Sequence, residues 1–338
     1  MVPGFSASAV AAKNQVYLSS LSGGSTSWAF ALNEQGVIVG QSGDAQGRSR
    51  PVRWDQNGTV ADLGTLAGDT EGTAHAINRD GTIVGESILG TRSRAVRWQP
   101  DGTTVALPGL SGSERTRAYS INNEGWVTGF SANQDGLYQP VRWEPSGALV
   151  RLPVLPGHVG GATSVINDQG VVAGYSATAD NVQRAVLWDA RGHVRDLGGV
   201  APGYDSSQAS SINDKGSVVG NTFKSSAGLD SPYLAQRWSP DGEVTRLRPL
   251  PGFSGSAVFG LSDSGVAVGY SYNPGGESSA VAWTPDGQVV DLGVSGRQSS
   301  EAYAVNRAGT VVGQRTPSGE GPQAVRWNID SLCAGDRT

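Results

Sequence analysis

The segment from Leu63 to Trp98 reads Leu-Gly-Thr-Leu-Ala-Gly at 63–68, Ala-His-Ala-Ile-Asn-Arg-Asp-Gly-Thr-Ile-Val-Gly at 74–85 and Ala-Val-Arg-Trp at 95–98. Its core is an Asn-x-x-Gly turn with a glycine ten residues before the Asn, a glycine seven residues after it, and a closing tryptophan. This arrangement recurs at a period of about 45 residues, which is typical of the four-stranded blades of β-propellers. The turn residues are Asn33, Asn78, Asn122, Asn167, Asn213, Ser262 and Asn306. The closing tryptophans are Trp54, Trp98, Trp143, Trp188, Trp238, Trp283 and Trp327.

Each unit also predicts four strands. In the unit that contains Asn78 they are 74–77, 81–85, 95–98 and 105–110, all rich in β-branched residues and separated by turn residues. The Asn-x-x-Gly link suits a tight turn with Gly at its fourth position. No stretch has a sustained apolar period of 3.6 residues, so we expect an all-β protein. Because seven tryptophans occupy one fixed register, we expect them to pack between blades.

The two ends of the chain predict how the ring closes. Residues 328–338 are too short and polar for a fourth strand, whereas residues 15–24 align with the fourth-strand region at 59–69. The sequence therefore predicts one domain at 1–330, a seven-bladed propeller of four-stranded antiparallel blades. Residues 13–22 would supply the outer strand of blade seven, and 331–338 would form a C-terminal tail. The blades would start near residues 29, 74, 118, 163, 209, 258 and 302. Such closure removes open sheet edges.

The repeat resembles the HAF-repeat family of bacteria. The resemblance rests on Asp62-Leu-Gly-Thr-Leu-Ala-Gly, on 76–85 and on Arg94-Ala-Val-Arg-Trp, and it spans essentially the whole chain. The third-strand signature of that family, His-Ala-Phe-x-Trp, appears here as Arg-Ala-Val-Arg-Trp or Pro-Val-Arg-Trp, so a role of the signature His cannot be carried over. The resemblance implies a scaffold and often an extracellular location, and it specifies no activity.

Composition excludes several classes of partner and site. The net charge of −5 is spread without runs, which argues against nucleic acid and anionic membranes. No segment approaches the length of a membrane span. The lone Cys333 excludes an internal disulfide. The three histidines lack the spacing of a zinc site, so we expect no cofactor and no bound metal. The alternative is a calcium ion in the channel. The N-terminus lacks a basic region followed by an apolar core, which favours a cytoplasmic location; the alternative is a secreted protein that begins at its mature end. We also expect a monomer.

Variation between the repeats predicts where function lies. If the first strand of each unit lines the axis, the short turns share one end of the ring. The links into the first strand and those joining second to third strand share the other end, the mouth. Length and sequence vary almost wholly at the mouth, and variable loops on a rigid frame are where binding usually occurs. The longest link, Asn221 to Gln236, carries Phe223, Lys224, Asp230 and Tyr233 and is either a flap over the axis or a surface insertion.

The residues three and five before each turn Asn predict one lopsided pocket at the mouth. Blades seven, one, two and three place aromatic and ionisable side chains there, whereas blades four to six place mostly small ones. In blade order the pairs are Phe30/Trp28, His75/Thr73, Tyr119/Arg117, Ser164/Ala162, Ser210/Gln208, Phe259/Ala257 and Tyr303/Glu301. A lectin with one sugar site per blade would repeat its polar groups, and this chain does not.

Roles follow from the chemistry of these side chains. Glu301 or His75 would be the base, Arg117 the partner of an anion, and Tyr119 or Tyr303 the acid. Trp28, Phe30 and Phe259 would stack on an apolar or aromatic ligand. The other expected ligand-binding residues are Glu86, Tyr175, Gln208, Tyr270, Phe223 and Tyr233. In the alternative interpretation the tyrosines, and His75 in the same position, only pack the repeat.

Two functions remain open. The first is an enzyme without a cofactor that acts on one small organic molecule at the mouth by cyclisation, elimination, isomerisation or hydrolysis, and the lyase or cyclase classes fit it. The second is a non-catalytic propeller that binds a protein or glycan on the same face. An enzyme site predicts a cavity of a few hundred cubic ångströms, whereas a protein-binding face predicts a shallow exposed aromatic patch.

Overall fold

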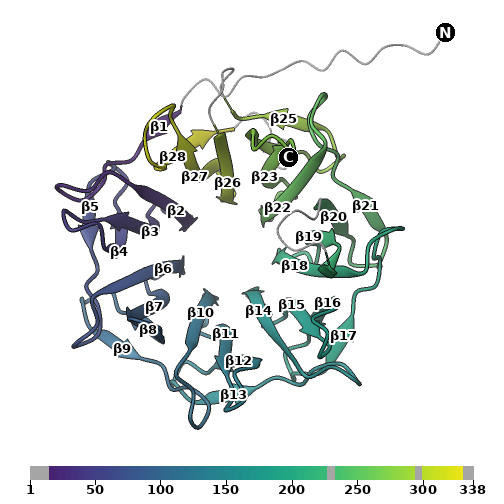
Figure 1. The fold of residues 1–338 in the computed structure, drawn as a ribbon, viewed down its shortest axis with the longest axis horizontal. Helices are drawn as coiled ribbons and strands as arrows, with labels where there is room; N and C mark the ends of the chain where they lie inside the picture. Colours follow the sequence, from purple (N-terminus) through teal and green to yellow (C-terminus); the bar gives the residue numbers. More distant parts are fainter. Residues whose placement is uncertain (1–14, 227–232, 294–298, 330–338) are drawn as a thin grey trace.

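The computed structural model describes residues 15–226, 233–293 and 299–329, and these residues form seven four-stranded antiparallel sheets arranged in a ring (Figure 1). Blade 1 comprises β2–β5, blade 2 β6–β9, blade 3 β10–β13, blade 4 β14–β17, blade 5 β18–β21 and blade 6 β22–β25. Blade 7 comprises β26–β28 and β1, so the N-terminal strand supplies its outer edge. The predicted seven-bladed β-propeller and its closure are confirmed.

In blades 1 to 6 the first strand lies nearest the axis and the others follow outward in chain order, and in blade 7 the order outward is β26, β27, β28 and β1 (Figure 1). The axial strands are β2 (Ser27–Leu32), β6 (Glu71–Ile77), β10 (Thr116–Ile121), β14 (Gly160–Ile166), β18 (Ser206–Ile212), β22 (Gly255–Leu261) and β26 (Ser299–Val305). The second strands are β3 (Ile38–Gly43), β7 (Ile83–Leu89), β11 (Val127–Ala132), β15 (Val172–Ala177), β19 (Val218–Phe223), β23 (Ala267–Tyr272) and β27 (Thr310–Thr316). The axial strands start two or three residues before the expected blade starts.

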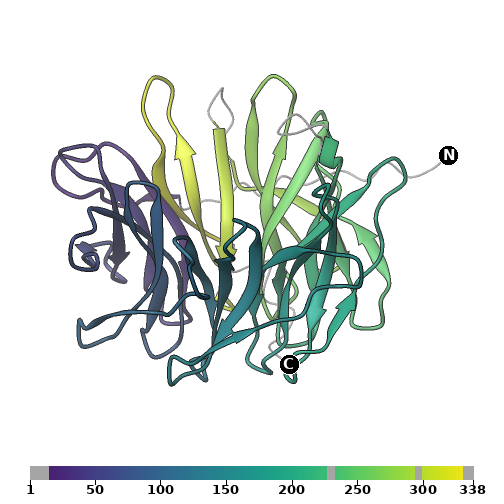
Figure 2. The ribbon, with the colours of Figure 1, turned by 60° about the horizontal axis from the view of Figure 1, so that its bottom comes forward.

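The two outer strands complete each blade. The third strands are β4 (Ser49–Trp54), β8 (Arg92–Trp98), β12 (Tyr138–Trp143), β16 (Gln183–Trp188), β20 (Leu234–Trp238), β24 (Ser278–Trp283) and β28 (Gln323–Asn328). The fourth strands are β5 (Val60–Asp62), β9 (Thr104–Ala106), β13 (Leu149–Arg151), β17 (Val194–Asp196), β21 (Val244–Arg246), β25 (Val289–Asp291) and β1 (Val16–Tyr17). Figure 2 shows that the links gather at the two ends of the ring. We call them the turn end, which carries the Asn-x-x-Gly turns, and the mouth end.

The closing tryptophans pack between blades and also donate hydrogen bonds. Trp98 is 2 % exposed and shares a core cluster with Val39 of blade 1 and Ile83 of its own blade. Its indole Nε1 donates to the carbonyl of Gly64, 3.1 Å away, in the link between the two blades. Five other closing tryptophans make the same bond to the preceding link. A fixed Trp therefore provides apolar area and satisfies a link carbonyl at each of these junctions.

At the turn end the side-chain amides of the repeated Asn residues join blade to blade. The Asn78 Oδ1 accepts the backbone N–H of Thr82 and closes its own turn, while its Nδ2 donates to the carbonyl of Asn122 in the next blade. Six such inter-blade bonds occur among the described residues, at 3.1–3.3 Å. Ser262 lacks an amide, and its hydroxyl stays within its own turn.

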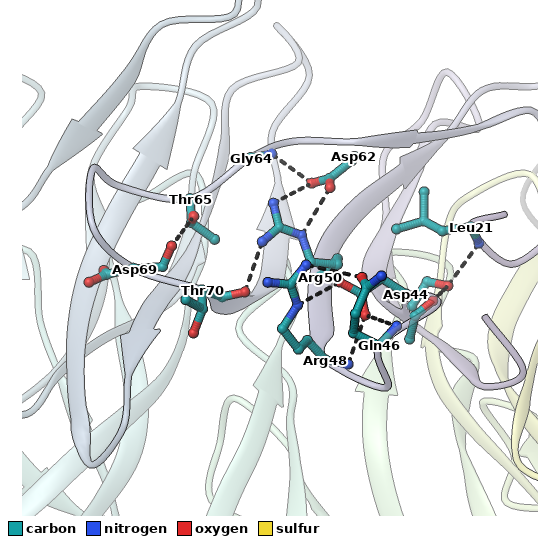
Figure 3. A network of polar contacts seen from close by, with 12 residues as sticks. Leu21, Asp44, Gln46, Arg48, Arg50, Asp62, Gly64, Thr65, Asp69 and Thr70 are labelled. Atoms are coloured by element: carbon teal, nitrogen blue, oxygen red, sulfur yellow. Dashed lines mark hydrogen bonds and ion pairs between the residues drawn. The ribbon is translucent and has the colours of Figure 1, made fainter. Parts of the chain in front are cut away.

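Ion pairs tie the outer strands to the mouth-end links (Figure 3). Arg50 lies four residues before the closing Trp54. Its Nε lies 2.9 Å from Asp62 on the neighbouring strand β5, and its NH1 donates to the carbonyl of Thr70 in the link to blade 2 (Figure 3). The position therefore has a structural role in blade 1 that arginine fulfils.

Candidate functional site

Each axial strand carries a β-bulge at the residue three before the turn Asn. In β6 the pairing with β7 passes from Ala74 to Ala76, which leaves His75 outside the register. The same shift occurs in the other six blades. A bulge re-aims its side chain and is often found beside active sites. The seven bulge residues are Phe30, His75, Tyr119, Ser164, Ser210, Phe259 and Tyr303.

The bulge side chains form an aromatic arc around most of the channel. The ring centroids of Phe259 and Tyr303 are 5.6 Å apart, and those of Tyr303 and Phe30 are also 5.6 Å apart. His75 lies 6.0 Å from Phe30 and 5.3 Å from Tyr119. These spacings are those of tilted and edge-on aromatic pairs. The arc spans blades 6, 7, 1, 2 and 3 and is interrupted at blades 4 and 5, where the bulge residue is serine.

A cavity of about 440 Å³ lies inside this arc. Its size is within the range of small-molecule sites. Six of the seven bulge residues line it, together with two neighbouring small residues of β14 and aromatic residues of blades 3 and 4. The lining residues are Phe30, His75, Tyr119, Phe130, Tyr138, Ala162, Thr163, Ser164, Tyr175, Phe259 and Tyr303.

A buried carboxylate lies behind His75. The side chain of Glu86 is 5 % exposed, and its Oε2 lies 2.7 Å from the Nε of Arg117, at ion-pair distance without hydrogen-bond geometry. Its Oε1 lies 3.6 Å from the Nε2 of His75. Burial opposes the charge of Arg117, but the adjacent Glu86 carboxylate raises the pKa of the guanidinium. The imidazole that faces the cavity is thus backed by a carboxylate and by the cation that balances it.

Burial keeps three of the tyrosines around the cavity, Tyr119, Tyr175 and Tyr303, protonated at neutral pH. Burial raises the pKa of Tyr119 against the opposing effect of Arg117, and burial raises the pKa of Tyr175 to about 12. The hydroxyl of Tyr303 donates to the Oε2 of Glu301 at 2.7 Å, and burial followed by the Glu301 charge raises the pKa of Tyr303. A ligand oxygen in the cavity would meet neutral O–H groups.

Of the residues five before the turn Asn, Ala162 lines the cavity, whereas three others contact the previous blade. The hydroxyl of Thr73 donates to Gln41 of blade 1, and Arg117 pairs with Glu86 of blade 2. The amide of Gln208 donates to Gln183 of blade 4. Glu301, Arg117 and Gln208 are not among the residues that line the cavity. The cavity lining thus contains the bulge side chains and not these three, and their roles at a ligand stay predictions.

Other predicted ligand-binding residues also lie outside the cavity lining. Trp28 holds the same register position in β2 as Arg117 holds in β10. Tyr270 packs on Phe259, with ring centroids 5.7 Å apart, and Phe223 packs on Tyr233 at 5.5 Å. Residues 227–232 of the predicted flap, including Asp230, lie outside the described residues, as do Cys333 and the predicted tail.

Two aromatic lining residues were not predicted. Phe130 directly follows the repeated glycine of blade 3, the position that Glu86 and Tyr175 hold in blades 2 and 4, so comparison of the repeats would have identified it. Tyr138 begins β12 and packs on Phe130 with ring centroids 4.1 Å apart. Nothing in the repeat marks the first residue of a third strand as part of the axis.

No family model matches the chain, and no curated protein matches it. Solved structures share its fold. A catalytically inactive virginiamycin B lyase from Staphylococcus aureus with quinupristin has a TM-score of 0.63 at 11% identity, over 94% of this chain and 99% of that one. Oligogalacturonate lyase from Vibrio parahaemolyticus has a TM-score of 0.62 at 11% identity, over 91% and 92%. A puromycin hydrolase mutant has a TM-score of 0.64 at 13% identity, over 91% of this chain and 52% of that one.

The shared feature is the propeller fold. At these identities the likeness concerns the backbone, and function must be argued from the site. Among the described residues, no helix has the length and apolarity needed to cross a bilayer. The same residues contain no cluster of three or more His, Cys, Asp or Glu side chains that could hold a metal ion.

Proposed function

We propose that the protein is an enzyme that moves a proton on one small, largely apolar or aromatic molecule bound in the cavity. The observation that carries the proposal is the position of His75, whose ring faces the cavity while the buried Glu86 carboxylate lies 3.6 Å behind its Nε2. A carboxylate in this position favours a proton on Nε2, which leaves Nδ1 as the proton acceptor.

Tyr119 supplies the acid in this proposal. Its ring centroid is 5.3 Å from that of His75, and its raised pKa keeps the phenol protonated. In an elimination, His75 takes a carbon-bound proton and the phenol protonates the oxygen of the departing group as its bond to carbon breaks. In an isomerisation, the phenol protonates the carbonyl oxygen to give an enol, the proton on His75 is then delivered to a different carbon, and the phenol recovers its proton from the enol oxygen. Phe30, Phe130 and Phe259 would hold the apolar part of the substrate. Known propellers of the same backbone include lyases, which is consistent with this class of reaction.

The experiment uses a panel of aromatic ketones, aryl lactones and β-substituted aryl propionates, each with a C–H next to a carbonyl. The protein is incubated with the panel in D₂O, and NMR follows deuterium incorporation and loss of the β-substituent. We expect exchange or elimination with at least one compound. The reaction should fall by about 10²-fold or more in His75→Phe, because a positioned base contributes about 10²–10⁴-fold.

His75→Phe is a conservative choice because Phe30 and Phe259 already occupy the same bulge position. His193→Gln is the matched control, since this histidine is exposed at the other end of blade 4. Compounds that shift the melting temperature but never react, or full activity in His75→Phe, would contradict the proposal and support a non-catalytic binding protein.

A further inference from the structure

A second ligand site, outside the proposed reaction, is indicated at the turn end of blade 4, where a repeated arginine is replaced by Leu187. The residue before the closing tryptophan is arginine in five blades, and in four of them its guanidinium reaches the next blade. The NH1 of Arg97 donates to the carbonyl of Pro145 at 2.9 Å, and its NH2 donates to that of Gly125 at 3.2 Å. A planar guanidinium has the geometry to donate to two such acceptors at once.

The same contact recurs with nearly the same acceptors. Arg237 of blade 5 donates to the carbonyls of Pro285, at 2.9 Å, and Gly265, at 2.8 Å, in blade 6. Arg142 donates to the carbonyl of Ala190, and Arg326 to that of Gln56. The acceptors are the residue two after the next tryptophan and the glycine of the next Asn-x-x-Gly turn. The groove between adjacent blades is therefore a guanidinium site that the protein usually fills itself.

The remaining three blades differ from one another. Arg53 of blade 1 is exposed. Blade 6 has Ala282, and the carbonyl of the next turn glycine, Gly309, accepts a hydrogen bond from the backbone N–H of Ile329 in place of an arginine. Blade 4 has Leu187, which packs against Ile212 of blade 5 and has no donor to offer to the carbonyls of Gly216 and Pro240.

At blade 4 the structure contains a groove of about 550 Å³, and its walls include Leu187, Gly216 and Pro240. Two carboxylates, Asp189 and Asp214, also line it. The cations Arg195 and Lys215 and the ring of His193 lie on the same walls, so recognition depends on the placed carbonyls more than on net charge.

We propose that this groove binds an arginine side chain presented by a peptide segment of a partner, with its guanidinium in the place that Arg97 and Arg237 occupy in their grooves. The two carbonyls would accept its N–H groups and Leu187 would contact its methylene stem. A peptide is favoured over free arginine because a free α-carboxylate would enter a groove that holds two carboxylates. The groove is far larger than a guanidinium, so neighbouring peptide residues fit beside the side chain.

The test titrates the full chain with N-acetyl-arginine N-methylamide by calorimetry. We expect saturable binding, at least tenfold weaker binding of the neutral citrulline analogue, and weaker binding of free arginine. Leu187→Arg restores the residue of the other blades and should occupy the groove itself, so the affinity should fall at least tenfold. Arg237→Leu is the matched variant, because it should open the equivalent groove over Gly265 and add a second binding site.

Binding that is equal for the arginine and citrulline probes, or unchanged in Leu187→Arg, would overturn the proposal, as would no saturable binding by the wild type. Should Leu187→Arg not fold, amide chemical shifts of the wild type decide. The N–H signals of Leu187 and Gly216 should move with the arginine probe and not with the citrulline probe. Shifts confined to other blades would also contradict the groove.

Discussion

At the scale of single residues, the site is built by one position per blade whose identity is free to vary. The bulge fixes the direction of the side chain through the backbone, so Phe30, His75 and Ser164 all point to the axis although their chemistry differs. The fold therefore tolerates a reactive residue at a bulge, because the packing between blades depends on other positions.

The buried phenols around the cavity should make stability depend on alkaline pH. Tyr175 has a folded pKa of about 12, above the value of about 10 for an unfolded tyrosine. Its contribution is complete below pH 10 and is lost as the pH rises toward 12, because the unfolded state loses its proton first. We expect the free energy of unfolding, measured by urea denaturation, to fall between pH 10 and 12. The fall should be shallower in Tyr175→Phe; parallel curves for the two proteins would contradict the assignment.

Sequence comparison identified the bulge position but not its geometry. Placing His75, Tyr119 and Phe259 around one axis required only the period of the repeat. Separating Phe30 from Trp28 required knowledge of the bulge, because in a regular strand residues two apart share a face. The register shift depends on how β2 pairs with β3, which no single residue of the sequence records.

At the scale of strands, the glycine seven after each turn Asn has a role that the sequence pattern did not reveal. These glycines, unlike the turn glycines such as Gly125 at φ 83°, do not have positive φ. A Cβ on Gly129 would lie 1.8 Å from the carbonyl oxygen of Arg117, and the other six blades give 1.9–2.2 Å. The second strand therefore approaches the axial strand closely just where the bulge begins, and only glycine fits.

Gly129→Ala should consequently destabilise the protein, by about 3 kcal/mol, because the clash is with backbone and the strand must move. The measurement is urea denaturation followed by tryptophan fluorescence. Gly275→Ala is the matched control: this glycine lies in a link of blade 6, has no positive φ and would have no neighbour within 4 Å of its Cβ. Its effect should stay within about 0.5 kcal/mol. Equal losses in both variants would show that the close approach is not what requires glycine.

At the scale of the whole molecule, the sequence predicts the ring because each repeat carries its own turns and its own inter-blade tryptophan. Closure was also predictable, since residues 15–24 align with a fourth strand and β1 pairs with β28 in the structure. The sequence did not predict which side chains face the cavity and which lie between blades. This depends on where the twist of each blade places its side chains relative to the next blade.

The circle of Asn amides at the turn end is open at one junction, and closing it should stabilise the ring. Asn213 donates to the carbonyl of Ser262, but Ser262 has no amide to donate to Asn306, while Asn306 donates onward to Asn33. In Ser262→Asn the new Nδ2 would stand where six equivalent amides already bond. One added buried hydrogen bond contributes about 1 kcal/mol, which corresponds to a rise of about 2 °C in melting temperature.

Asn122→Ser makes the opposite change and serves as the comparison. Ser262 shows that a serine hydroxyl can close the turn within its own blade, since it accepts the N–H of Val266. Asn122→Ser should therefore lose only the bond to the Asn167 carbonyl and lower the melting temperature by a similar amount. Calorimetry of both variants measures the two shifts. Because blades share stability with their neighbours, melting-temperature shifts of opposite sign in the two variants would place the amide circle among the interactions that hold the ring closed. A Ser262→Asn protein that melts at a lower temperature than the wild type would show that an amide at the open junction destabilises the ring.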